Sequence, residues 1–108
     1  MNKAIITGRL GEDAEVIDTK NGKFLVKLVI ATRDMDQTDW HQVKIVNENL
    51  ARTCKKCRKG MIVSVSGKLK TRKHIDSNNS THYSTYIQAE EVIFHSPLNQ
   101  SKDEGQNG

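Results

Sequence analysis

The chain has 108 residues, 28% of them charged and 35% hydrophobic, which suits one soluble domain with a modest core. No apolar run approaches the roughly 20 residues of a membrane-spanning helix, and the start MNKAIITGRLGED lacks the apolar core of a secretory signal, so we expect a cytoplasmic protein. The formal net charge of +4 suits a polyanionic partner such as nucleic acid, or it merely keeps the chain soluble.

The first half of the chain predicts three strands. The segment from Lys3 to Leu10 is expected to form a strand that bends at its glycines. The Asn-Gly pair in 18-DTKNG-22 is typical of a hairpin turn, and 23-KFLVKLVIAT-32 has the β-branched and aromatic content of a strand covered on both faces. After a short polar linker, 33-RDMDQTD-39, residues 40–46 alternate and predict a third strand. Its two faces would carry Trp40, Gln42, Lys44 and Val46 on one side and His41, Val43 and Ile45 on the other.

The second half predicts one helix and two strands. Apolar residues at helical spacing place the helix over 48–59, with Gly60 as its stop. From residue 61 the period returns to two, and the strand over 61–74 would carry Lys68, Lys70, Arg72 and His74 on one face. The cluster 75-IDSNNST-81 predicts a turn, and residues 82–94 predict the last strand.

This order of elements predicts an all-β fold. Five strands with one short helix between strands 3 and 4 are the order of an OB-fold, a five-stranded Greek-key barrel. We expect this domain over residues 1–95 and a disordered polar tail over residues 96–108.

Trp40 has polar neighbours, and cations follow on the same face of its strand and on one face of the strand over 61–74. If the two faces are coplanar, they offer a flat ring among cations. Such a surface suits single-stranded nucleic acid, because any base stacks on an aromatic ring while cations follow the phosphates. The alternative is that Trp40 caps the barrel and the lysines are a solvated face.

The remaining candidates for chemistry favour a structural interpretation. Cys54 and Cys57 in 54-CKKC-57 lack the further ligands that zinc needs, and we expect both thiols to be buried in the core. The four histidines share no metal-ligand spacing, and the aspartates of 33-RDMDQTD-39 lack the glycine and distal glutamate of a calcium loop. We therefore predict no metal, no cofactor and no enzymatic activity.

Several motifs, in order along residues 1–95, resemble the bacterial single-stranded DNA-binding proteins, an OB-fold family. The motifs are 2-NKAIITGRLGEDAEV-16, 21-NGK-23, 31-AT-32, 38-TDWH-41, 58-RKG-60, 67-GKLKTRK-73 and 89-AEEV-92. The resemblance implies sequence-independent binding of single-stranded DNA during replication, recombination or repair, and a homo-oligomer, with a tetramer expected before a dimer. It places His41 near subunit contacts. We expect DNA contacts from Arg9, Arg33, Trp40, Lys44, Lys70, Arg72, Lys73 and His74.

The sequence departs from the family pattern where that pattern has further aromatic residues. His74 and Val46 stand where an aromatic residue and a phenylalanine are usual, Gln42 replaces an arginine, and the loop before TDWH is short. We therefore expect weaker binding that depends more on phosphate contacts. The acidic, Phe-terminated tip of family members is also missing from the end DEGQNG, so partners recruited by the tail are doubtful.

Three other classes of function compete with this one. An OB-fold adaptor of the primosomal replication protein type would act mainly through protein contacts, and the thin aromatic set and the missing tip favour it. An RNA-binding cold-shock protein would need aromatic pairs such as FGF or FVH, which the sequence lacks. An enzyme would have to depend on Cys54 or Cys57, and a double serine variant tests that idea.

Overall fold

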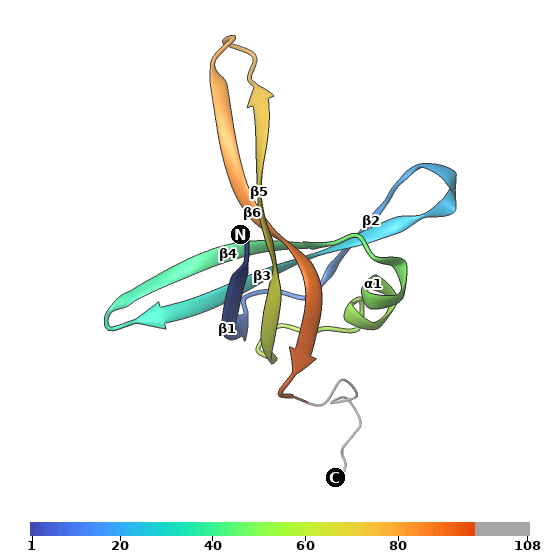
Figure 1. The fold of residues 1–108 in the computed structure, drawn as a ribbon, viewed down its shortest axis with the longest axis vertical. Coiled ribbons are helices and arrows are strands. Elements are labelled where there is room, and N and C mark those ends of the chain that lie inside the picture. Colours follow the sequence, from blue (N-terminus) through green and yellow to red (C-terminus); the bar gives the residue numbers. More distant parts are fainter. Residues whose placement is uncertain (97–108) are drawn as a thin grey trace.

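The computed structural model describes residues 1–96 as a barrel of strands with one short helix and three projecting hairpins (Figure 1). The predicted tail, from residue 97 on, lies outside the described residues. The elements in chain order are β1 (Ala4–Leu10), β2 (Glu15–Asp18), η1 (Lys20–Gly22), β3 (Phe24–Asp34), β4 (Gln37–Ile45), α1 (Glu48–Cys54), β5 (Ile62–Ile75) and β6 (Thr81–Phe94).

The strands are hydrogen-bonded in the order β1-β5-β6-β4-β3-β2, and a further pairing between β1 and β3 closes five of them into a barrel. Closure is possible because β1 bends toward β3 at Gly8, where a Cβ atom would overlap the carbonyl oxygen of Ala31. Every pairing is antiparallel except that of β4 with β6. The predicted all-β OB-fold is confirmed. The short strand β2, which pairs with β3 outside the closed ring, was missed by the sequence pattern.

The core fills the barrel from alternate positions of the strands. Side chains that are at most 4% exposed come from five strands and the helical segment, and they are Leu10, Val26, Leu28, Ile30, Val43, Ile45, Ala51, Cys54, Cys57, Met61, Val63, Val65, Ile87 and Ala89. The inward face of β4 carries Val43 and Ile45, which the alternation of that strand had placed together. In β3 the sequence pattern indicated cover on both faces, whereas only Val26, Leu28 and Ile30 are fully buried. The burial of both cysteines is also confirmed.

The prediction of a polar linker over residues 33–39 is wrong, because most of this segment belongs to the paired strands β3 and β4. β3 and β4 stay paired as far as Asp34 and Gln37, and the chain reverses at Met35, whose φ is +56°. The pattern of apolar residues gave no sign of this, because both strands continue beyond the barrel, where neither face needs apolar side chains. Residues 33–39 therefore form the end of a projecting hairpin.

The predicted helix over 48–59 is five residues too long. Asn47 caps its start by accepting a hydrogen bond from the Leu50 amide at 3.0 Å, and the helix ends at Cys54. Beyond it, backbone groups bond elsewhere: the Lys59 amide donates to the Asp13 carboxylate, and the Gly60 amide to the Leu10 carbonyl. These bonds draw the chain toward β1 and end the helix early.

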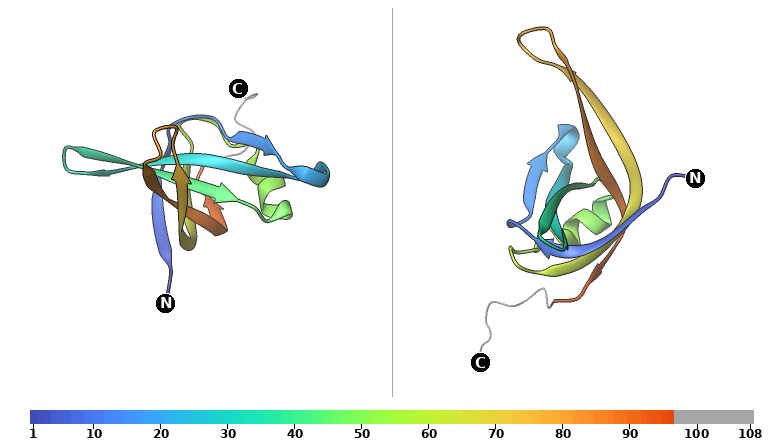
Figure 2. Two further views of the ribbon diagram at one scale, coloured as in Figure 1. Left: turned by 90° about the horizontal axis from the view of Figure 1, so that it is seen from above. Right: turned by 90° about the vertical axis from the view of Figure 1, so that its left-hand side faces the viewer.

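Three hairpins project from the barrel in different directions (Figures 1 and 2). They join β2 to β3, β3 to β4, and β5 to β6. The β5–β6 hairpin is the longest, with cross-strand pairs from Val63–Phe94 to Ile75–Thr81. We call its outer half, residues 70–86, the arm. None of the described helices is long and apolar enough to cross a membrane.

The barrel interior predicts a stability difference between two valines of one segment. Val43 is fully buried, whereas Val46, just past the end of β4, is 49% exposed. Val43→Ala should lower the free energy of unfolding by about 2–3 kcal/mol through lost burial and an unfilled cavity. Val46→Ala should cost about 0.5 kcal/mol or less. Denaturant unfolding at one fixed protein concentration measures both, and equal losses would contradict the assigned barrel interior.

Candidate nucleic-acid interface

The outer surface of β3 and β4 carries Trp40 in a row that crosses three strands. In the sheet, Trp40 lies opposite Ala31, and Ala31 lies opposite Arg9 of β1. Directly opposite residues of antiparallel strands point to the same face, so these three side chains share the outside of the barrel. Trp40 is 62% exposed. This excludes the alternative that the ring is buried as a cap of the barrel.

The ring lies over a gap that small residues provide. A Cβ atom at Gly11 would overlap Cζ3 of the Trp40 ring, and Ala31 presents only a methyl group beside it. The ring therefore lies against backbone at its edge while much of its surface stays open to solvent. The sequence showed the glycine and the tryptophan but not their contact, because they lie 29 positions apart, with Gly11 just past the end of β1 and Trp40 in β4.

A row of polar and cationic side chains runs beside the tryptophan on the same outer surface. Lys27 of β3 is paired with Lys44 of β4, Lys44 with Gln88 of β6, and Gln88 with Lys68 of β5. The two faces considered in the sequence analysis are therefore parts of one surface. We call it the Trp40 face; it comprises Arg9, Lys27, Arg33, Trp40, Lys44, Lys68, Lys70, Arg72, His74, Tyr86 and Gln88.

Lys44 is the most constrained cation of the Trp40 face. It is half-buried, and its Nζ lies 4.3 Å from the centre of the Tyr86 ring. Burial, followed by the like charges of Arg72 and Lys27, lowers the pKa of Lys44. The three cations therefore converge on one small region, where an anion would be favoured.

The arm separates the predicted residues onto two sides. Lys70, Arg72 and His74 lie opposite Tyr86, Ser84 and His82, and the alternation along β5 places them on the Trp40 face. Lys73 lies opposite Tyr83 on the other side of the ribbon, and the Tyr83 ring is 68% exposed. Arg72 and Lys73 are thus adjacent in sequence but reach different surfaces.

His74 forms a flat pair with His82 across the arm. The ring centres are 5.3 Å apart and the planes are inclined by 23°. His82 Nε2 lies 2.6 Å from Oδ2 of Asp76, and Oδ1 of the same carboxylate accepts hydrogen bonds from the amides of Asn78 and Ser80. These bonds, led by that of Ser80, lower the pKa of Asp76. The tip of the arm is therefore held in a defined turn.

Arg9 and Arg33 lie at the edges of the Trp40 face. Nη1 of Arg9 donates to the Gly60 carbonyl at 2.9 Å, which holds the guanidinium toward the end of the barrel. Nε of Arg33 donates to the Met35 carbonyl at 3.3 Å in the β3–β4 hairpin. Both remain exposed.

His41 points away from the Trp40 face. It is half-buried on the side of β4 that carries Val43 and Ile45, and its Nε2 lies 2.7 Å from the Thr32 hydroxyl. Its suggested contact with another subunit stays a prediction.

The sequence did not identify Lys27, Tyr86 and Gln88 as members of the Trp40 face, nor Tyr83 on the other side of the arm. Tyr83 and Tyr86 stand in the predicted last strand, and Lys27 stands in a strand that reads as covered on both faces. The cross-strand register places these residues on their surface, because it pairs Lys27 with Lys44 and Tyr86 with Lys70. The alternation within β6 was the available signal for Tyr86, but it does not show which neighbouring strand the ring faces.

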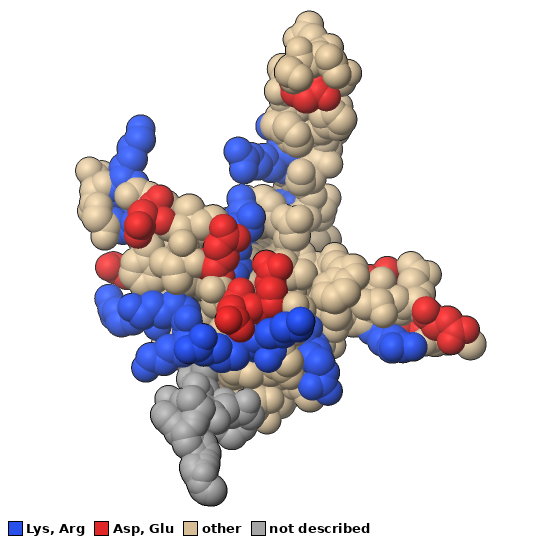
Figure 3. All heavy atoms as spheres, turned by 180° about the vertical axis from the view of Figure 1, so that it is seen from behind, with Lys and Arg blue, Asp and Glu red and all other residues tan. Residues whose placement is uncertain are grey.

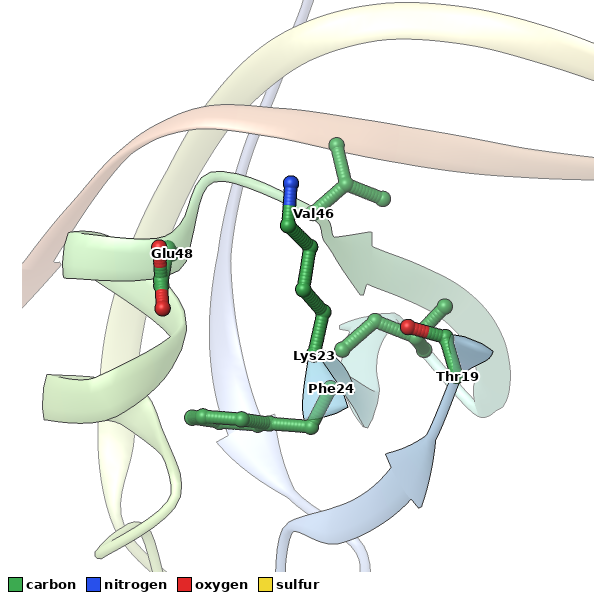
Figure 4. A pocket seen from close by; sticks show the side chains of 6 residues that line it. Thr19, Lys23, Phe24, Val46 and Glu48 are labelled. Atoms are coloured by element: carbon green, nitrogen blue, oxygen red, sulfur yellow. The ribbon is translucent and has the colours of Figure 1, made fainter. Parts of the chain in front are cut away.

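A hollow and a band of cations lie near α1, away from Trp40. A hollow of about 380 Å³ is lined by Phe24, Val46, Lys23 and Glu48, among others, beside α1 (Figure 4). Seen from behind, Lys and Arg side chains form a band on the side of the molecule where α1 lies, next to a group of acidic side chains (Figure 3). Within α1, Nη2 of Arg52 lies 3.7 Å from Oε2 of Glu48, and past the end of α1, Nη1 of Arg58 lies 3.7 Å from Oδ2 of Asp13.

The two thiols lie in the core of the barrel. The hydrogen bond to Cys57 and burial raise the pKa of Cys54. Among residues 1–96, the histidines, cysteines and carboxylates nowhere gather as three or more potential metal ligands.

A closed five-stranded barrel with an exposed ring and cations on one outer face defines an oligonucleotide-binding type of domain. The model of the single-strand binding protein family matches residues 1–95. The chain belongs to this family.

This chain is similar to many solved structures, among them those of two single-stranded DNA binding proteins. The Plasmodium falciparum SSB in complex with ssDNA is 28% identical, with a TM-score of 0.80 over 89% of this chain and 96% of that one. The mitochondrial single-stranded DNA binding protein Rim1 of S. cerevisiae is 20% identical, with a TM-score of 0.73 over 86% of this chain and 93% of that one. The latter likeness shows the fold alone.

The contact between Gly11 and Trp40 predicts a change that fluorescence can detect. Gly11→Ala should push the ring off its place against the backbone, because the new methyl group would overlap Cζ3. Trp40 is the single tryptophan, so its emission reports this directly. We expect acrylamide to quench it more strongly. Glu12→Ala, an exposed neighbour, is the control, and unchanged quenching in Gly11→Ala would show that the ring does not depend on the glycine.

Proposed function

We propose that this chain binds single-stranded DNA, largely independently of sequence, along the Trp40 face. The observation that carries this proposal is the 62% exposed Trp40 ring, which shares one outer surface with Lys27, Lys44 and Arg72. An exposed ring gives a base a surface to stack on, and cations beside it meet the phosphates. Membership of the single-strand binding family supports the same function.

Trp40 binds single strands rather than duplexes, because only single strands expose the faces of their bases. In a duplex the bases already stack on one another, so their faces are closed to Trp40. A single strand offers each base in turn, and every base has a flat face, so the contact tolerates any sequence. The bound strand is thereby protected during replication, recombination or repair. The exposure of Trp40 favours this function over that of an adaptor working mainly through protein contacts.

The remaining DNA contacts follow from the position of each residue around Trp40. Lys44, Lys70 and Arg72 meet phosphates on the Trp40 face, and Arg9 and Arg33 meet them at its edges. His74 offers its ring next to His82, and Lys73 binds a strand that continues around the arm. Because rings are few and cations many, affinity should fall steeply as salt rises.

We further propose a homo-oligomer, with the tetramer as the expected form before the dimer. On the side of the barrel formed by β1, β5 and β6, Ile5 is 69% exposed and Ile93 is 50% exposed, and both line a hollow of about 200 Å³. Exposed apolar side chains of this kind are typical of contacts between chains. His41 stays a predicted subunit contact. The mass in solution, measured by sedimentation equilibrium, tests the assembly.

We propose that the protein acts without catalysis and in the cytoplasm, in a bacterium or from a phage or plasmid. The buried state of Cys54 and Cys57 supports the first part, because neither thiol reaches a solvent-exposed surface.

Trp40 should contribute to affinity as a stacking ring. Trp40→Ala is expected to weaken binding of labelled oligo-dT by about 1–3 kcal/mol, whereas Trp40→Phe, which keeps a ring, should lose less. Fluorescence anisotropy at low and moderate salt measures both variants, with a duplex of equal length as control. In the unaltered chain, oligo-dT should quench Trp40 emission. Equal affinity of Trp40→Ala and the unaltered chain would refute a stacking role.

Arg72 and Lys73 allow the path of the strand to be mapped, since each variant removes one charge on a different side of the arm. Arg72→Gln should lower the slope of log affinity against log salt by about 0.7, the contribution of one phosphate contact on a single strand. Arg72→Gln should lower this slope even when the oligo-dT is short, because Arg72 lies on the Trp40 face. Lys73→Gln should have this effect when the oligonucleotide is long enough to reach the far side of the arm. Unchanged slopes in both variants would place the strand away from the arm.

A further inference from the structure

β4 and β6 form a fork beside the Trp40 face. Their parallel pairing joins Val43 to Ile87 and Lys44 to Gln88. Before these residues, β4 belongs to the β3–β4 hairpin and β6 to the arm, and the two project in different directions (Figure 1). A hollow of about 240 Å³ lies in this fork, with Trp40 and Gln42 from β4 and Tyr86 from β6 in its lining.

Tyr86 brings an aromatic ring to the side of the fork opposite Trp40. The ring is half-buried, and the Lys44 ammonium lies over it, 4.3 Å from its centre. A cation over an aromatic face is attracted to it, so in the free protein this contact covers the ring.

The Lys44 ammonium, which lies over the Tyr86 ring, is in an unfavourable electrostatic environment. Lys44 lies directly opposite Lys27, and like charges directly opposite each other in a sheet repel. Arg72 adds a third positive charge, and together with burial these neighbours lower the pKa of Lys44. None of the ion pairs among residues 1–96 gives the Lys44 ammonium a carboxylate partner. A phosphate entering this region would attract all three cations at once.

We propose that Tyr86 is a second base-stacking ring, which Lys44 covers in the free protein and uncovers when a DNA phosphate binds its ammonium. This inference rests on the proposed function and identifies a subsite within it. The cation then holds the backbone while a base takes its place on the ring, so one movement creates both contacts. Trp40 lies in the lining of the same hollow, so consecutive parts of one strand meet the two rings.

The other rings of the described residues are less suited to this role. His74 is already stacked on His82, and Tyr83 faces the far side of the arm. Phe24 lies partly buried against the core beside α1. Tyr86 therefore compensates, within the Trp40 face, for the aromatic residues that the sequence lacks at positions 46 and 74.

Nuclear magnetic resonance of the full chain labelled with ¹³C at lysine Cε tests the movement. The ring current of Tyr86 should shift the Lys44 ε-protons upfield in the free protein, and the signal is assigned by its loss in Lys44→Met. Saturation with oligo-dT of about 16 nucleotides, the upper site size of one OB-fold, should return these protons to ordinary lysine positions. Lys27 ε-protons serve as an internal control without a ring contact.

Affinity and cross-linking test the stacking itself. Tyr86→Leu should weaken oligo-dT binding about 5- to 150-fold, the range for loss of one stacked base, whereas Tyr86→Phe should bind like the unaltered chain. Irradiation of the unaltered chain with oligonucleotides containing 5-iodouracil should yield an adduct at Tyr86, which mass spectrometry locates even if Tyr86→Leu folds poorly.

The outcomes separate the two proposals. If the unaltered chain binds no oligo-dT at low salt, the proposed function fails, and this inference fails with it. If it binds, but the Lys44 ε-protons stay upfield and no adduct forms at Tyr86, the inference alone is overturned. If a folded Tyr86→Leu variant and the unaltered chain bind oligo-dT with equal affinity, the inference about Tyr86 is likewise overturned while the proposed function stands.

Discussion

The short parallel pairing of β4 with β6 is the contact on which the shape of the interface depends. It joins the β3–β4 hairpin to the β5–β6 hairpin through Val43 and Ile87, which are 0% and 4% exposed. Because both hairpins continue past this contact, they separate and leave a hollow between them. The same contact fixes which side chains point outward, since alternation along each strand proceeds from these two buried residues.

Lysines on the outside of the barrel differ in whether a carboxylate balances their charge. Lys3 and Lys68 both lie within 4.0 Å of Glu90, so an acidic partner balances them. Lys27 and Lys44 instead lie opposite each other, with Arg72 close enough to lower the pKa of Lys44. Such a cluster weakens the free protein slightly and is relieved by a polyanion. Repulsion between these cations therefore lowers the stability of the free protein and favours the binding of a polyanion.

Small residues shape the interface as much as charged ones do. Gly8 lets β1 approach β3 and close the barrel, and Gly11 lets the Trp40 ring lie against the backbone. The only tryptophan therefore sits on the outside of the barrel, supported by a glycine rather than by an apolar pocket. Such a ring stays flat and open, which is the geometry that base stacking requires.

The sequence by itself determined the barrel, the buried side of β4 and the burial of Cys54 and Cys57, and it offered Trp40 as a candidate ring. These follow from local alternation and composition, which act within one strand. It mistook residues 33–39 for a linker, because the β3–β4 hairpin runs past the barrel, where neither face needs apolar side chains. It extended the helix past Cys54, because the end of the helix is set by hydrogen bonds to distant segments. Tertiary structure alone decided that Lys27, Lys44, Arg72 and Tyr86 meet, since cross-strand register depends on how the whole barrel closes.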